Sequence, residues 1–165
     1  MNMDGGIESL REEQSGLAAA IRREFLLENA DIRTYSPLTL AYIGDGIYDM
    51  IIRTILVEYG NAHVNRLHKK ASGYVKAKAQ KDLFFRIEKE LSEEEIAVYK
   101  RGRNARSATV AKNASVSDYR IATGVEALFG YLYLLGRQKR IFELLRAGFP
   151  ELTGQPGKEG LDNEV

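Results

Sequence analysis

The feature that most constrains this chain is a long apolar stretch, residues 36–60, which reads SPLTLAYIGDGIYDMIIRTILVEYG and contains the carboxylate Asp45. A serine–proline pair opens the stretch, and this pair is typical of a helix start. At 3.6 residues per turn, four apolar residues share a face with Asp45, namely Leu38, Ala41, Tyr48 and Ile52. We therefore expect Asp45 to point toward the core, where an isolated carboxylate is costly unless it is protonated, paired or bound to a metal.

A second apolar stretch repeats this anomaly. A helix is predicted from Ser115 or Ser117 to about Leu135, and Glu126 is the only charged residue between Arg120 and Arg137. The residues on the face of Glu126 are mostly apolar: Tyr119, Ala122, Thr123, Phe129 and Tyr133. Two core helices are thus each expected to present one acid inward. Glycines beside the acids would allow the two helices to approach closely, and these are Gly44, Gly46, Gly124 and Gly130.

Two facing carboxylates repel each other unless a positive charge lies between them. The chain has no cysteine, and neither helix carries a histidine, so oxygen ligands favour Mg²⁺ or Mn²⁺ over zinc. The alternative is that the acids pair with an arginine such as Arg53 or Arg120, or that one of them protrudes into solvent. The pattern of residues alone leaves both interpretations open.

Composition narrows the class of protein. Without cysteine, the 165-residue chain can form neither a disulfide nor a thiolate site. The first residues, MNMDGGIESLREEQ, are acidic and polar, whereas a signal peptide needs a basic start and an apolar run. The longest apolar run, residues 121–135, is shorter than the roughly 20 residues of a membrane span. We expect a cytoplasmic protein without a membrane segment.

The net charge of +1 conceals two basic tracts. Residues 63–81 and residues 100–117 contain lysines and arginines but no acid. A face built from both tracts would suit a polyanion, whereas the simpler interpretation is a solvated surface.

The remaining pattern predicts helices and no strands, so the fold class is all-α. We expect one helix from about residue 7 to 29, two helices in residues 62–89 with a break near 72–73, and a short helix from about Glu93 to Lys100. Ser92 and Glu95 form a capping-box pattern at that short helix. A functional loop is expected over residues 101–116, and a last helix over 138–147. The domain prediction is a helical extension at 1–30, a main domain at 31–150 and a flexible tail at 151–165.

Four segments carry a resemblance to a known family. AYIGD at residues 41–45 and VEALFG at 125–130 resemble the two acidic helices of the ribonuclease III family. LHKK at 67–70 and KRGRNA at 100–105 make the chain more similar to the mini-ribonuclease III subfamily. The resemblance covers about residues 36–145. It implies a ribonuclease III-type helical endonuclease domain without the double-stranded-RNA-binding domain of the larger enzymes.

The resemblance implies a reaction and a set of partners. The reaction would be metal-dependent hydrolysis of double-stranded RNA, giving 5′-phosphate ends. Asp45 and Glu126 would be the catalytic and metal-binding residues. The ion would be Mg²⁺, for which Mn²⁺ can substitute. A homodimer would cut both strands, and the substrate would be a 23S ribosomal RNA precursor, presented with the help of a large-subunit ribosomal protein. The expected RNA-binding residues are Lys69, Lys70, Lys76, Lys78, Arg101, Arg103, Asn104 and Arg106.

The chain departs from the family pattern at two of four acidic positions, which are occupied by Ala41 and Thr123. Fewer charged ligands imply weaker or more hydrated metal binding and leave the number of ions open. One alternative function is therefore a non-catalytic ribonuclease III-like RNA-binding or ribosome-assembly protein. A helical nucleotide pyrophosphohydrolase is a weaker alternative, because the two core helices lack its clustered E-x-x-E ligands.

Overall fold

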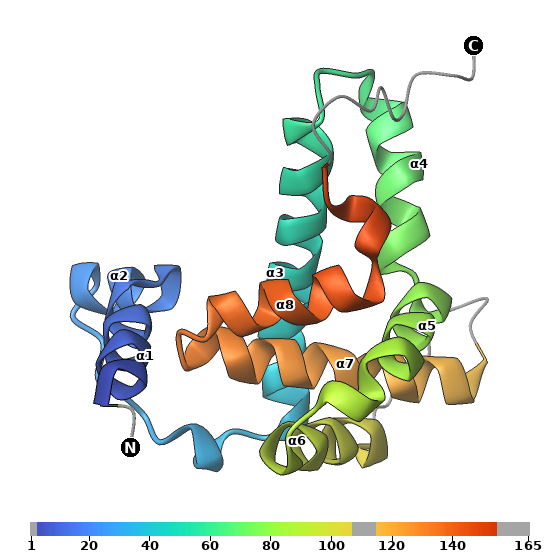
Figure 1. Cartoon of the computed structure of the whole chain (residues 1–165). Helices are drawn as coiled ribbons and strands as arrows, with labels where there is room; N and C mark the ends of the chain where they lie inside the picture. Colours follow the sequence, from blue (N-terminus) through green and yellow to red (C-terminus); the bar gives the residue numbers. More distant parts are fainter. Residues whose placement is uncertain (1–2, 107–114, 155–165) are drawn as a thin grey trace.

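The computed structural model describes residues 3–106 and 115–154, and within these ranges every regular element is a helix. The all-α prediction is confirmed. The longer helices are α1 (Met3–Ser15), α2 (Leu17–Glu24), α3 (Pro37–Glu58), α4 (Val64–Val75), α5 (Ala77–Ile87), α6 (Glu93–Asn104), α7 (Val116–Leu134) and α8 (Gln138–Gly148) (Figure 1). Short 3₁₀ turns occupy Ile32–Thr34, Glu88–Glu90 and Pro150–Leu152.

The centre of the fold is the crossing of α3 and α7, which touch backbone to backbone. A Cβ atom added to Gly44 of α3 would collide with the carbonyl group of Glu126, and one added to Gly130 of α7 would collide with the carbonyl group of Leu40. The prediction of close approach is therefore confirmed for Gly44 and Gly130. Only residues without a side chain fit this contact.

The other two glycines behave differently from the prediction. Gly124 packs against the ring of Tyr99 on α6 and not against α3, and nothing lies within 4 Å of a Cβ added to Gly46. Gly102 of α6 in turn approaches Ala127 and Gly124 of α7. Because α7 meets a close neighbour on two sides, most of its length is buried.

Two helix boundaries in this part of the chain differ from those predicted. The break after α4 falls at Lys76, which has an extended backbone, and not at residues 72–73. The capping box of Ser92 and Glu95 is confirmed, but α6 continues to Asn104, so residues 101–104 are helical and not part of a loop. Residues 107–114 of that expected loop lie outside the described residues.

Glu95 does more than cap α6. Its buried carboxylate accepts hydrogen bonds from Nε and Nη2 of Arg140 on α8, at 2.8 and 3.0 Å. These bonds and the backbone bond from Ser92 oppose the effect of burial and keep the pKa of Glu95 below its usual value. The pair therefore ties α8 to the start of α6.

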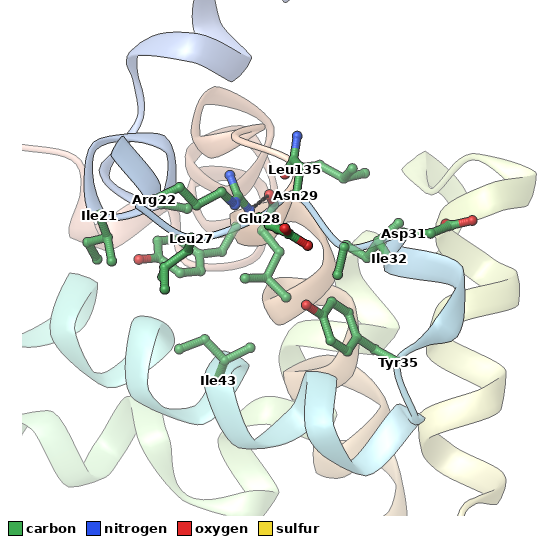
Figure 2. Close-up of a pocket in the computed structure, with 14 residues that line it drawn as sticks. Ile21, Arg22, Leu27, Glu28, Asn29, Asp31, Ile32, Tyr35, Ile43 and Leu135 are labelled. Atoms are coloured by element: carbon green, nitrogen blue, oxygen red, sulfur yellow. Dashed lines mark hydrogen bonds between the residues drawn. The ribbon is translucent and has the colours of Figure 1, made fainter. Parts of the chain in front are cut away.

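The N-terminal extension is two helices and not one. Gly16 has an extended backbone and separates α1 from α2. Arg22 of α2 donates a hydrogen bond of 2.6 Å to the carbonyl oxygen of Leu134 at the end of α7, where the helix dipole favours a positive charge. Beside this contact, a pocket of about 510 Å³ lies between the extension and the core, with Ile21, Tyr35 and Leu135 in its lining (Figure 2).

Among the helices in the described ranges, none is long and apolar enough to cross a membrane. The division into an extension at 1–30, a main domain at 31–150 and a tail stays a prediction. Residues 155–165 of that tail lie outside the described residues.

Leu26 occupies a backbone conformation that favours glycine. Its φ is +53°, and it follows α2 in a Schellman arrangement, with the amides of Leu26 and Leu27 bonded to the carbonyl oxygens of Arg23 and Arg22. The side chain of Leu26 is 90% exposed and contributes little packing.

Leu26→Gly should therefore stabilise α2 by about 0.5–1 kcal/mol, because glycine adopts this conformation without steric cost. Hydrogen exchange of the α2 amides measures the effect. Leu27→Gly is the control, since Leu27 has no positive φ and its replacement should weaken protection. Lower protection in Leu26→Gly than in the wild type would contradict the argument.

Candidate functional site

Asp45 lies at the edge of the buried face of α3 and not within it. The residue is exposed, whereas Ala41 and Tyr48 on the same side of the helix are buried. The prediction that Asp45 points into the core was wrong. Its face reaches solvent because Leu38, one of the four apolar neighbours, is itself 37% exposed. Protein atoms still desolvate its carboxylate in part, and this desolvation, together with the charge of Asp49, raises the pKa of Asp45.

Glu126 is half-buried on α7, directly beside the glycine contact. Burial raises the pKa of Glu126 from 4.5 to about 7, and the charge of Asp45 adds to this shift. The α3–α7 crossing therefore brings the two predicted acids into each other's electrostatic field. Two carboxylates in such a field hold a proton or a cation more readily than either would alone.

A third polar residue, Gln80 of α5, contacts Glu126. Its side chain is buried, and its Nε2 donates hydrogen bonds to Oε1 of Glu126 at 3.3 Å and to the carbonyl oxygen of Val75 at 3.0 Å. The bond to Glu126 opposes the rise in its pKa. Oε1 of Gln80 is buried and has no hydrogen-bond partner in the described part of the protein.

Sequence reasoning did not single out Gln80, although a signal was present. Gln80 shares its helix face with Leu83, Phe84 and Ile87, all of which are buried. A polar residue on an apolar face is the same anomaly that drew attention to the two acids.

Neither acid is neutralised by an arginine or lysine within residues 3–106 and 115–154. Arg53, a candidate partner, instead pairs with Asp49 at 2.8 Å. No lysine or arginine contributes to the raised pKa of Asp45 or Glu126. Pairing of the acids with arginine, the first part of the alternative left open by the sequence, is thus not supported, whereas the exposure of Asp45 matches its second part, that one acid protrudes into solvent.

The residues present fit a hard cation with few protein ligands. The two carboxylates are oxygen donors, which Mg²⁺ and Mn²⁺ prefer, and no lysine or arginine of the described residues lowers the pKa of either one. Ala41 and Thr123 add no charge, and the buried hydroxyl of Thr123 donates to the carbonyl oxygen of Tyr119. In the described residues, no three acids or histidines gather around one point, so water would complete the coordination.

The predicted RNA-binding residues occupy three places outside this acidic pair. Lys69 and Lys70 lie on α4, and Lys76 and Lys78 lie at the α4–α5 joint and on the first turn of α5. Three more residues, Arg101, Arg103 and Asn104, end α6, and Arg106 follows it. All are exposed except Lys70 and Arg103, which are partly buried.

Two of these arginines also have partners within the protein. Arg101 donates to the carbonyl oxygen of Tyr35 at 3.4 Å, and the guanidinium of Arg103 lies 5.7 Å from the ring centre of Tyr99. Lys81, in the first basic tract, pairs with Asp118 at 2.8 Å and ties α5 to the first turn of α7. The basic tracts are thus partly structural.

Known proteins similar to this chain were found by sequence and by structure. The ribonuclease III domain model matches residues 38–137. Mini-ribonuclease 3 of Clostridium tetani is 48% identical over 130 residues, covering 76% of this chain and 86% of that protein. Mini-ribonuclease 3 of Enterococcus faecalis is 49% identical over 117 residues, covering 70% and 89%. A crystal structure of a Fusobacterium nucleatum protein, 31% identical, covers 76% of this chain and 100% of that one with a TM-score of 0.68.

The raised pKa of Glu126 predicts a dependence of stability on pH. The folded protein holds this proton more tightly than the unfolded chain, so stability should fall as pH rises from about 4.5 to about 7. Urea denaturation in metal-free buffer at pH 5 and pH 7.5 measures the free energy of unfolding at each pH. Relative to Glu126→Gln, which cannot ionise, the wild type should lose about 1–3 kcal/mol over this range. Equal pH dependence in the two proteins would contradict the assignment.

Proposed function

Because this chain belongs to the ribonuclease III family, in its mini-ribonuclease 3 branch, it is an endoribonuclease, and we propose that it hydrolyses double-stranded RNA in a metal-dependent reaction. The observation that carries the proposal is the pair of Asp45 and Glu126 at the α3–α7 crossing, which lacks a cationic partner among the described residues. The proposed substrate is a duplex in a 23S ribosomal RNA precursor, cut in the cytoplasm.

Asp45 and Glu126 would hold Mg²⁺, or Mn²⁺ in its place. Such an ion supplies a polarised water as the nucleophile and stabilises charge on the phosphoryl oxygens. The roles of the two acids follow from their positions. Glu126 is half-buried and must lose its proton, whose pKa is about 7, before it can bind a cation. Asp45 is exposed, so an RNA duplex in solvent could reach it.

Duplex binding would come from the two basic tracts. Lysine and arginine side chains neutralise phosphates, and a duplex of RNA is recognised mainly through phosphates and 2′-hydroxyls. Six of the eight residues proposed for this role are exposed, which supports their availability. They are Lys69, Lys76, Lys78, Arg101, Asn104 and Arg106.

A homodimer would present two such sites to one duplex and so cut both strands. Exposed apolar side chains along α3 support this assembly, above all Tyr42, which is 82% exposed three residues before Asp45. Met50 and Val57 of the same helix are also exposed. A protein of the large ribosomal subunit would present the RNA to this dimer.

The second candidate is a non-catalytic RNA-binding protein of the same fold. The observation that favours it is the loss of two acids, since Ala41 and Thr123 cannot replace them. The two candidates differ in one measurable property, which is hydrolysis of a duplex in the presence of Mg²⁺.

Asp45→Asn and Glu126→Gln should each reduce cleavage of a labelled RNA duplex in Mg²⁺ by at least about 100-fold, because each removes a charge from a two-carboxylate site. Gel analysis of the products measures the rate, and binding of the same duplex without metal should stay near the wild-type value. If the wild type cuts no duplex in Mg²⁺ or Mn²⁺, the non-catalytic candidate is correct.

The double variant Arg101→Ala/Arg103→Ala should bind duplex RNA more weakly and lower the slope of log affinity against log salt by about 1–2. Fluorescence anisotropy at several salt concentrations measures this slope. Arg33→Ala is the matched control, because Arg33 is an exposed arginine outside both basic tracts. An unchanged slope in the double variant would place the RNA on another surface.

A further inference from the structure

Gln80 is the buried polar residue that the proposed mechanism leaves unexplained. It is 3% exposed on the first turn of α5, and it faces α7 through its contact with Glu126. We propose that Gln80 is a positioning residue, whose amide fixes the carboxylate of Glu126 in the orientation that binds the metal ion. This inference rests on the proposed function and extends it to a residue on a third helix.

The two hydrogen-bond acceptors beside the amide fix its orientation. Nε2 donates one hydrogen to the carbonyl oxygen of Val75 and the other toward Oε1 of Glu126. Turning the amide by half a rotation would place Oε1 against two oxygen atoms, which repel it. The carbonyl oxygen of Val75, at the end of α4, therefore holds the amide with its N–H group directed at Glu126.

Within the described part of the chain, the side chain of Gln80 lacks one of the hydrogen bonds that a buried amide with a purely structural role would be expected to form. Its Oε1 is buried without a partner in the described residues, and such an atom loses its hydration without compensation. The neighbouring positions on this face are Leu83, Phe84 and Ile87, so an apolar side chain would fit the surroundings. A group that satisfies a carboxylate while leaving its own oxygen unpaired is typical of functional sites.

Orientation matters more where ligands are few. Position 123 holds threonine, whose hydroxyl is occupied by the carbonyl oxygen of Tyr119, so Glu126 is the only acid that α7 offers to the site. A glutamate has three side-chain torsions, and an unrestrained carboxylate loses affinity when it is ordered on a cation. The bond from α5 would hold Glu126 in advance of binding.

The test compares wild type with Gln80→Leu, which has a similar volume and no hydrogen-bonding groups. Binding of Mn²⁺ is measured by isothermal titration calorimetry without RNA at pH 8.5, where the proton no longer competes for Glu126. We expect the dissociation constant to rise about 10-fold. The melting temperature without metal should equal or exceed that of the wild type, because an unpaired buried oxygen is removed.

Tyr48→Phe is the matched control. The hydroxyl of Tyr48 donates to the carbonyl oxygen of Tyr74, so this variant removes a tie to the end of α4 but no bond to Glu126. It should leave Mn²⁺ affinity unchanged. In a Glu126→Gln background, Gln80→Leu should add no further loss, since Gln80 acts through the carboxylate.

Three outcomes would overturn the inference. Wild-type Mn²⁺ affinity in Gln80→Leu, with RNA cleavage intact, would exclude the positioning role and leave the proposed function standing. An equal loss in Tyr48→Phe would assign the effect to the packing of α4. Absence of both Mn²⁺ binding and duplex cleavage in the wild type would remove the inference together with the proposed function.

Discussion

The contact on which this structure depends is the crossing of α3 and α7 through Gly44 and Gly130. Neither position accepts a Cβ atom, because each would collide with a backbone carbonyl group of the facing helix. This contact sets the separation of the helix axes, and Asp45 follows Gly44 directly in the sequence. The glycines therefore determine how far the carboxylate of Asp45 lies from that of Glu126. A metal-binding pair requires that distance to be small, so the packing of the core and the chemistry of the site share one constraint.

The site lowers the stability of the metal-free protein, and contacts elsewhere compensate. Glu126 is desolvated beside a second carboxylate, and Oε1 of Gln80 has no hydrogen-bond partner among the residues that the structure describes. Contacts that hold the surrounding helices lie away from the acids. Arg140 binds Glu95 between α8 and α6, and Lys81 binds Asp118 between α5 and α7. A site that must accept a cation keeps desolvated and unpaired groups that lower the stability of the folded protein, and ion pairs elsewhere in the fold offset this loss.

Much of the fold could be predicted from sequence because the relevant signals are local. Ser36 caps α3 as predicted, and Ser115, one of the two predicted caps, opens α7, since a cap depends on residues within one turn. Prediction failed where local signals were weak. The spacing of apolar residues predicted one continuous helix across Gly16, but the backbone is extended there and separates α1 from α2. The composition of residues 101–104 gave no sign that α6 continues over them. The exposure of Asp45 was missed because a helical wheel gives the direction of a side chain but not the width of the face that a neighbour covers.

Gln80 shows a different limit of the same reasoning. The sequence shows that Gln80 lies on an apolar helix face, as it does for Asp45 and Glu126. An amide carries no charge, however, so burying it costs less free energy than burying a carboxylate and attracts less attention. What distinguishes it from an ordinary buried amide is its partner, a carboxylate 46 residues away on another helix. Periodicity describes one helix at a time and cannot identify such a partner. This chain has alanine and threonine at two of the four acidic positions of the family, so fewer carboxylates surround the proposed ion. The orientation of the two remaining acids then depends more on polar groups of neighbouring helices, such as Gln80.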